Sequence, residues 1–283
     1  MAALLEFLEP NVFSPLGTLV FVLVALCYWR GQRRLKAAGT PVAWWRSLLF
    51  YFCWGAAYVA LETRFDYYAQ FLFFMHRLQH MLLHHLLAFL LALAMPFPVL
   101  NAGLGDAFPR HLWPFRLLAA CVRWLMHPLV ASVLFVGLIA FWLYPPVHLA
   151  AMLNYPLYIT MNWSMLVDGL LFWPMILDNR IAARVGAKAY GARLAALAFT
   201  LIAQVLIGAY ITFREGGLYD IYTVCGRPWP IAPATDQVLG GVLTWIPPAM
   251  MAVIGALVVF RFYLRDDEEK TRTKQAQEEE SKR

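Results

Sequence analysis

Charged residues are scarce in this chain. Only 14% of its 283 residues are Asp, Glu, Lys or Arg, whereas 61% are hydrophobic. A soluble globular domain carries roughly a quarter charged residues and about half apolar ones. The composition therefore excludes an ordinary soluble fold, because the excess of apolar side chains has to face lipid.

The chain also lacks the short motifs of common enzyme classes. It contains no GxSxG, P-loop or GxGxxG pattern, so hydrolase and nucleotide-dependent activities have no support. The cysteines form no CxxC pair and no metal-ligand spacing, and we expect all of them to be structural: Cys27, Cys53, Cys121 and Cys225. We predict that the protein is not an enzyme.

Long apolar runs separated by short joints predict an all-α membrane protein, a polytopic bundle of about seven transmembrane helices. A spanning helix needs about 20 mostly apolar residues. We expect spans at residues 13–28, 42–61, 69–94, 128–144, 157–177, 194–213 and 238–260, and an interfacial helix at 111–124. Residues 1–260 would form the bundle. Residues 261–283 would form a charged cytoplasmic tail, which we expect to be a frayed or disordered helix extension.

The net charge of +6 is distributed in clusters between the apolar runs. Every second joint is rich in Lys and Arg, and the others are poor in them, as the positive-inside rule requires. This alternation predicts an N-terminus outside and a C-terminus in the cytoplasm. It also explains the positive charge without a nucleic-acid partner, so the expected surroundings are the lipid bilayer. The basic clusters centre on Arg33, Arg116, Arg184 and Arg265.

Histidines are concentrated in the third predicted span. His76, His80 and His84 recur at every fourth residue and so share one helix stripe, whereas His85 lies about 100° round. Polar residues inside a membrane are costly and usually functional. Two imidazoles four residues apart can bind one metal ion, and His148 in the following outer joint could join them. Interhelical hydrogen bonding is the alternative role for these histidines.

The fifth predicted span carries a second polar group. Asp168 is either a proton-accepting or metal-facing residue, or the counter-charge of Arg77 or Arg46. Arg77 itself either reaches outward to the joint at residues 62–66 or pairs with an acid inside the bundle. Thioether ligands would favour Cu(I), although methionines also fill irregular cores; those near the histidines or in the fifth span are Met75, Met81, Met161 and Met165.

The motifs HRLQHMLL, DGLLFWPMILD, GAYITFREGGLYDIY and DQVLGGVLTWIPPAM, in this order, resemble the seven-helix CtaG family of cytochrome c oxidase assembly factors. In the last motif the matching residues are Asp236, Gln237, Gly240, Gly241, Trp245 and Pro247. The resemblance covers most of the chain. The sequence departs from the family pattern where many members carry further histidines: Tyr144, His148 and Asn162 occupy those neighbourhoods.

The resemblance implies an assembly factor for a haem-copper oxidase in the bacterial inner (plasma) membrane, with oxidase subunits as partners. Copper would be handled at the extracytoplasmic side, with His76 and His80 as the main ligands. The wider candidate metal set is His76, His80, His84, His148 and Asp168. Two alternatives remain open: a haem-binding membrane protein, and a metal-free scaffold that holds oxidase subunits during assembly.

Overall fold

The computed structural model describes residue 9 and residues 14–105, 112–185, 190–224 and 226–281, and these contain helices and no β-strand. The predicted all-α class is therefore confirmed for this part of the chain. The helices are α2 (Pro15–Ala37), α3 (Trp44–Glu62), α4 (Arg64–Phe71), α5 (Phe73–His80), the π-helix η1 (Met81–Leu86), α6 (Leu87–Ala94), α7 (Pro96–Leu104), α8 (Trp113–Leu125), α9 (Pro128–Leu143), α10 (Pro145–Leu153), α11 (Tyr155–Leu177), α12 (Asn179–Arg184), α13 (Tyr190–Phe213), α14 (Ile221–Val224) and α15 (Pro233–Ser281).

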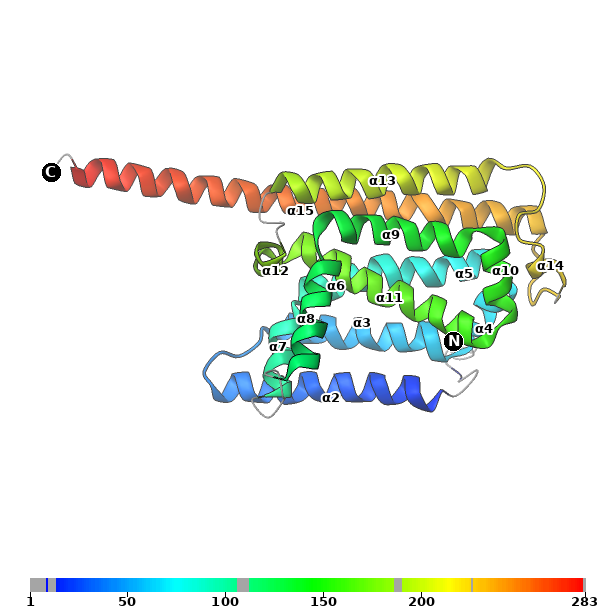
Figure 1. The fold of residues 1–283 in the computed structure, drawn as a ribbon, viewed down its shortest axis with the longest axis horizontal. Helices are drawn as coiled ribbons and strands as arrows, with labels where there is room; N and C mark the ends of the chain where they lie inside the picture. The colour runs from blue at the N-terminus through cyan, green and yellow to red at the C-terminus, as the bar shows by residue number, and fades with distance from the viewer. Residues whose placement is uncertain (1–8, 10–13, 106–111, 186–189, 225, 282–283) are drawn as a thin grey trace.

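Four stretches of the described chain are long and apolar enough to cross a membrane: α2, Phe73–Ala94, α13 and α15. Helices α8 and α9, bent by 78° from each other, make a fifth if the pair is one span. Helices α3 and α11 lie alongside these in the bundle (Figure 1), but polar and aromatic residues lower their hydropathy. The structure thus supports a multi-pass membrane protein, and the count of seven spans stays a prediction.

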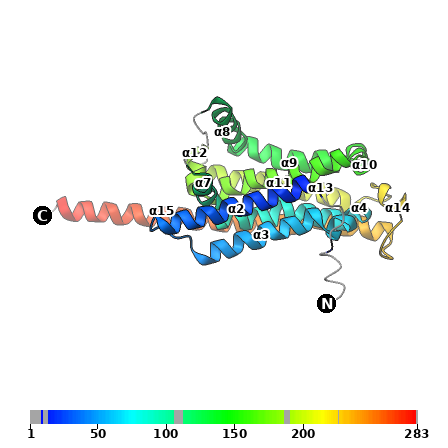
Figure 2. The same cartoon turned by 90° about the horizontal axis from the view of Figure 1, so that it is seen from below.

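The bundle has two chemically different ends (Figures 1 and 2). Helices α7, α8 and α12 gather at the end from which α15 projects, and Arg34 at the end of α2 donates to the carbonyl of Ala102 there. Helices α4, α10 and α14 form the opposite end. The basic clusters therefore collect at one end, as the predicted topology requires, although which side of the membrane that end faces stays a prediction.

The predicted third span, 69–94, is interrupted at its start. Leu72 has an extended backbone, with φ −133° and ψ 123°, and separates α4 from α5. The membrane-crossing helix therefore begins at Phe73 rather than at Ala69, which places His76 in its first turn. Further along, six residues adopt the π-helix η1, which carries His84 and His85. Because a π-turn changes the angular spacing of side chains, the expected stripe of three histidines is broken between His80 and His84.

Residues 96–104, which lie outside the predicted spans, form the helix α7. Pro96 occupies its first turn, where a missing N–H costs nothing. Helix α7 then packs very closely on α2: a Cβ on Gly31 would lie 1.9 Å from the carbonyl oxygen of Val99, and one on Gly103 would lie 1.9 Å from that of Cys27. Only glycine at both positions permits this contact.

The tail, expected to be a frayed or disordered helix extension, is an ordered helical extension of the last span in the described residues. Helix α15 continues without a break to Ser281 and extends beyond the bundle as an exposed helix (Figure 1). Acidic residues four positions before basic ones, such as Asp266 before Lys270 and Glu268 before Arg272, support an exposed helix of this kind.

Reporter fusions test the predicted orientation. A fluorescent protein fused after Arg265 should fluoresce, because that end is predicted to be cytoplasmic. Alkaline phosphatase fused after Gly216, which lies at the opposite end, should be active, because the enzyme matures only outside the cytoplasm. Exchanging the two reporters provides the control and should silence both. Phosphatase activity after Arg265 would reverse the assignment.

Candidate metal centre

His76 is fully buried in the first turn of α5, and it is surrounded by other aromatic rings. The centroid of its ring lies 4.3 Å from that of His80 and 5.1 Å from that of His148. Neither ring nitrogen makes a hydrogen bond of good geometry among the described residues, although the backbone carbonyl of Ala69, at the end of α4, lies close to the ring. An unpartnered buried polar atom costs about 1–3 kcal/mol, so the His76 ring is a strong candidate for contact with a ligand.

Both nitrogens of His80, in contrast, are engaged. Its Nδ1 lies 3.3 Å from a guanidinium nitrogen of Arg77, and its Nε2 lies 2.9 Å from Oδ1 of Asn162. Arginine can only donate, so Nδ1 accepts, and the single proton of a neutral imidazole must sit on Nε2. His80 is therefore held as one tautomer by partners on two sides.

His148 comes from α10 and is fixed in the other tautomer. Its Nδ1 lies 3.0 Å from the carbonyl oxygen of Trp142, which can only accept, so Nδ1 carries the proton. Its Nε2, 2.9 Å from the Tyr222 hydroxyl, then accepts from Tyr222. Burial lowers the pKa of His148 to about 4, so the ring is neutral at physiological pH. Among the described residues, the Tyr222 hydroxyl occupies the Nε2 lone pair of His148.

His84 and Asp168 form a separate pair deeper in the bundle. Nε2 of His84 lies 2.9 Å from Oδ2 of Asp168, and the His84 ring stacks on Phe135 at 3.9 Å. The indole N–H of Trp173 donates to the backbone carbonyl of His84. Of the two arginines considered as partners for Asp168, neither makes a hydrogen bond or ion pair with it within the described residues. The five candidate ligands are thus divided between a cluster of three histidines and this pair.

Arg77 is buried, with 4% of its surface exposed, and makes no ion pair with a carboxylate of the described residues. Its Nε donates to the Thr244 hydroxyl of α15 at 3.0 Å. Its second contact, with His80, begins a chain of hydrogen bonds. The chain continues through Asn162, whose Nδ2 lies 3.5 Å from Oδ1 of Asp66. Both earlier expectations for Arg77, a carboxylate partner inside the bundle and direct reach to the outer joint, are replaced by this indirect link.

Asp66 is the hydrogen-bond hub at the far end of that chain. Its Oδ1 accepts from Gln79 at 2.8 Å and from the Tyr158 hydroxyl at 2.7 Å, and its Oδ2 accepts from Gln70 at 2.8 Å. Burial raises the pKa of Asp66 to about 6, although these hydrogen bonds oppose the shift. The carboxylate therefore remains largely ionised at neutral pH, and it joins α4, α5 and α11 around the histidines.

Two cavities approach the histidine cluster from the α4, α10 and α14 end. The smaller, of about 30 Å³, is lined by Glu62, Asp66, Tyr158 and Asn162 among others, and has room for only one or two water-sized groups. The larger, of about 320 Å³, lies between α10 and the segment before α14 and is bordered by His148, Tyr219 and Asp220. One cavity thus leads to the partner of His80 and the other to His148.

The described residues contain no group of three or more His, Cys, Asp or Glu side chains already arranged to hold a metal ion. The described cysteines are free thiols: Cys27, Cys53 and Cys121. Cys225 lies outside the described residues. Met161 and Met165 are fully buried and pack in the same apolar cluster as Phe73, Tyr219 and Tyr222. They therefore lie in the packing around the histidines.

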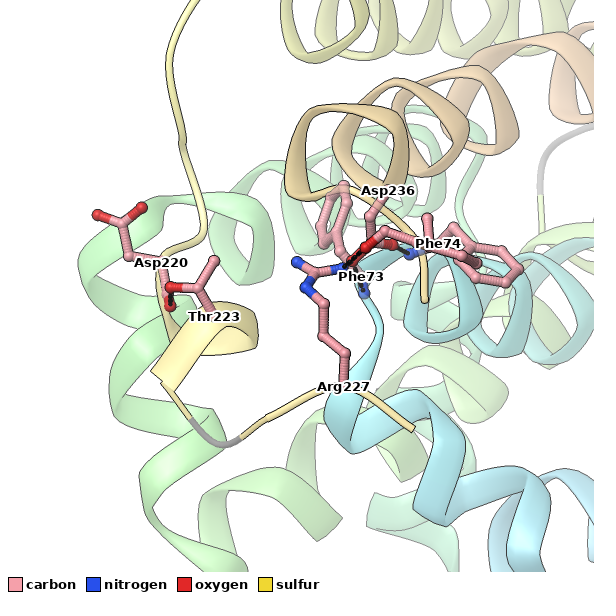
Figure 3. A network of polar contacts seen from close by, with 7 residues as sticks. Phe73, Phe74, Asp220, Thr223, Arg227 and Asp236 are labelled. Carbon is pink, nitrogen blue, oxygen red and sulfur yellow. Dashed lines mark hydrogen bonds and ion pairs between the residues drawn. The ribbon is translucent and has the colours of Figure 1, made fainter. Parts of the chain in front are cut away.

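A carboxylate from the other end of the sequence fixes the start of α5 (Figure 3). Asp236, in the first turn of α15, accepts from the backbone N–H groups of Phe73 at 3.1 Å and Phe74 at 2.8 Å. It also pairs with Arg227 at 2.7 Å. Asp236 therefore acts as the N-cap that Leu72 cannot provide, and it holds the turn that carries His76.

Several residues of this site were not identified from the sequence. Asp66, Tyr158 and Tyr222 are isolated polar residues in joints or apolar runs, and no spacing rule links residues so far apart. The sequence feature that could have indicated them is the recurrence of Tyr and acidic residues in or beside the connecting loops that are poor in Lys and Arg. The DQVLGG motif gave a clearer signal: Gly240 packs directly on the Phe73 ring, and the side chain of Gln237 binds the backbone of Leu218.

Replacing Asp236 by Ala should destabilise the protein by about 2–4 kcal/mol, because two N–H groups lose their cap and Arg227 loses its partner. Thermal unfolding in detergent measures the effect. Modification of His76 by diethyl pyrocarbonate, followed by mass spectrometry, should also become faster. Asp220→Ala is the matched control, since Asp220 precedes α14 at the same end of the bundle and faces solvent (Figure 3). Equal stability of the two variants would show that the cap is unimportant.

Comparison with known proteins gives one match. Searches of curated proteins and of solved structures found no significant similarity. The sequence pattern of the cytochrome c oxidase caa3 assembly factors, however, matches residues 26–266. The match includes about half of α2, α3 to α14 and the apolar part of α15, and hence every residue of the histidine cluster. This chain is a member of the cytochrome c oxidase caa3 assembly factor family.

Proposed function

We propose that this protein handles copper during assembly of a haem-copper cytochrome c oxidase, at the α4, α10 and α14 end of the bundle. The observation that carries the proposal is the buried His76 ring, with two unpartnered nitrogens, between His80 and His148. By the positive-inside argument this end faces outward from a bacterial plasma membrane. Oxidase subunits are the partners that the family implies.

The donor set suits a soft, monovalent copper ion. Neutral imidazoles bind copper well, and nearby thioethers favour Cu(I); the cluster offers three imidazoles, with Met161 and Met165 in the surrounding core. No carboxylate of the described residues makes a hydrogen bond or ion pair with His76. Binding at Nε2 of His148 requires the Tyr222 side chain, whose oxygen lies 2.9 Å from that nitrogen, to move aside. Binding at His80 requires the release of Arg77 or Asn162.

The buried guanidinium of Arg77 has a consequence for affinity. A fixed positive charge beside the site opposes the binding of a second cation in a medium of low dielectric constant. Asp66 offsets this charge only through two intervening side chains. Such a site would hold copper weakly and release it readily, which suits a protein that passes the ion to an oxidase subunit.

His84 and Asp168 are assigned a positioning role. The carboxylate of Asp168 occupies Nε2 of His84, and stacking on Phe135 fixes the ring. Their distance along α5 and η1 from the outer cavities also separates them from an ion that arrives at that end. A haem group is less well supported than copper, because Phe73 and Tyr222 pack against the His148 ring, beside which a macrocycle would have to lie.

Replacing His76 by Ala should abolish copper binding by the purified protein. The loss should exceed the roughly 10–100-fold that removal of an outer hydrogen-bond partner costs, because a ligand is lost. His80→Ala should have a similar effect, and His85→Ala, which removes a histidine from the deeper layer, is the control that should retain copper. Metal analysis and isothermal titration with Cu(I) measure binding, and circular dichroism checks that each variant remains helical.

The same variants decide between copper handling and a scaffold role. Under the proposal, cells with His76→Ala accumulate the folded protein but lose oxidase activity. Full oxidase activity in both His76→Ala and His80→Ala cells would remove the support for a metal site and favour the metal-free scaffold.

Deletion of the gene should lower haem-copper oxidase activity while oxidase transcripts remain at their normal level, because the defect lies in assembly. Respiration with a cytochrome c substrate and transcript quantification measure the two effects. Added copper should restore part of the activity if supply is limiting, and the wild-type gene on a plasmid should restore all of it. Unchanged oxidase activity in the deletion strain, in the absence of a second gene copy, would refute the assembly role.

A further inference from the structure

Helix α8 has no buried residue and lies across the end of the bundle opposite the histidine cluster. It is bent by 78° from α9, so that its axis runs roughly across the bundle. Its apolar side chains are uncovered, including Trp113 at 73% exposure and Trp124 at 65%. Exposed apolar area of this extent requires a partner, and tryptophans at both ends of a helix are typical of the membrane interface.

Two neighbouring cavities open beside α8. The first, of about 1010 Å³, is bordered by Arg116 and Arg123 of α8. The second, of about 480 Å³, lies between α7 and α12 and is bordered by Arg180 and Arg184. Asn101 and Leu104 of α7 border both cavities, so the two cavities adjoin each other along α7, and we call them together the basic groove.

The charge of the basic groove is largely uncompensated. Arg180 is neutralised by Asp178, whose carboxylate it contacts at 2.9 Å. The three remaining arginines, Arg116, Arg123 and Arg184, make no ion pair within the described residues. Arg116 and Arg123 are seven residues apart and therefore project from one face of α8. Three positive charges thus surround a groove whose walls are mainly apolar.

We propose that the basic groove binds an anionic phospholipid of the adjacent leaflet. The phosphate is held by Arg123 and Arg184, because each guanidinium group can donate two parallel hydrogen bonds to phosphate oxygens. The acyl chains cover the apolar side chains of α8, and Arg116 adds attraction at the rim. Charge complementarity selects an anionic headgroup, and the uncovered apolar surface requires a lipid rather than a soluble anion. This site is independent of the copper proposal.

Binding of phosphatidylglycerol to the full-length protein in detergent, measured by native mass spectrometry, tests the proposal. Phosphatidylglycerol should be retained in preference to phosphatidylcholine with the same acyl chains. The double substitution R123Q/R184Q should weaken its binding about 30-fold, at roughly fivefold for each positive charge near the headgroup. R123K/R184K keeps the charge and should retain most of the binding.

The matched control is R265Q/R272Q, which removes the same charge from the exposed part of α15 at the same end of the molecule and should leave binding unchanged. Equal loss in both double variants would overturn the groove assignment, because a diffuse surface charge would explain the data. Equal retention of both lipids would overturn it as well. Displacement of the lipid by millimolar inorganic phosphate alone would reduce the site to a phosphate site and refute the lipid.

Discussion

The arrangement of the candidate site depends on two buried charges that do not touch. Arg77 on α5 and Asp66 on α4 are linked through His80 and Asn162, and in this chain every donor points towards the carboxylate. Burial of one charge without the other would be strongly destabilising, so the two constrain each other through the side chains between them. The tautomer of His80 follows from this constraint. The constraint also requires α11 to turn Asn162 towards α5.

The same constraint leaves His76 without a side-chain hydrogen-bond partner among the described residues. Its neighbours already use their hydrogen-bonding groups: His80 contacts Arg77 and Asn162, and His148 contacts Trp142 and Tyr222. A buried polar side chain in a folded protein normally has a hydrogen-bond partner. The contrast between one unpartnered histidine and two fixed ones is the property that distinguishes a prospective ligand site from ordinary interhelical hydrogen bonding.

Interactions between distant parts of the sequence hold this site in place. Asp236 caps α5 across 163 residues of chain, and Tyr222 reaches His148 from the segment between α13 and α15. The segment that includes Tyr219 and Tyr222 thus covers the histidines, and the ion pair between Arg227 and Asp236 anchors its far end. Access to His148 from the 320 Å³ cavity therefore depends on the packing of this segment.

Composition, apolar run lengths and charge clusters determined the helical membrane class, and most predicted spans agree with a helix to within a few residues, as at 128–144 and α9. The sequence also identified the segment that carries most of the buried histidines, because polar residues in a long apolar run are conspicuous. The prediction from the sequence was wrong about the backbone at the start of the third span, at η1 and at α7. There the backbone is set by the Asp236 cap, by a π-turn and by glycine contacts with α2, none of which leaves a periodic pattern.

The division of the five candidate ligands was decided only by the tertiary structure. Spacing on one helix placed His76, His80 and His84 together, but spacing carries no information about what the neighbouring helix presents. Asn162 and Asp168 on α11 meet different histidines, and His148 joins the outer cluster because α10 folds back over α5. Helix periodicity is a local property of the chain, whereas the partner of each buried polar group is fixed by packing between helices, and that packing separates His76 from His84.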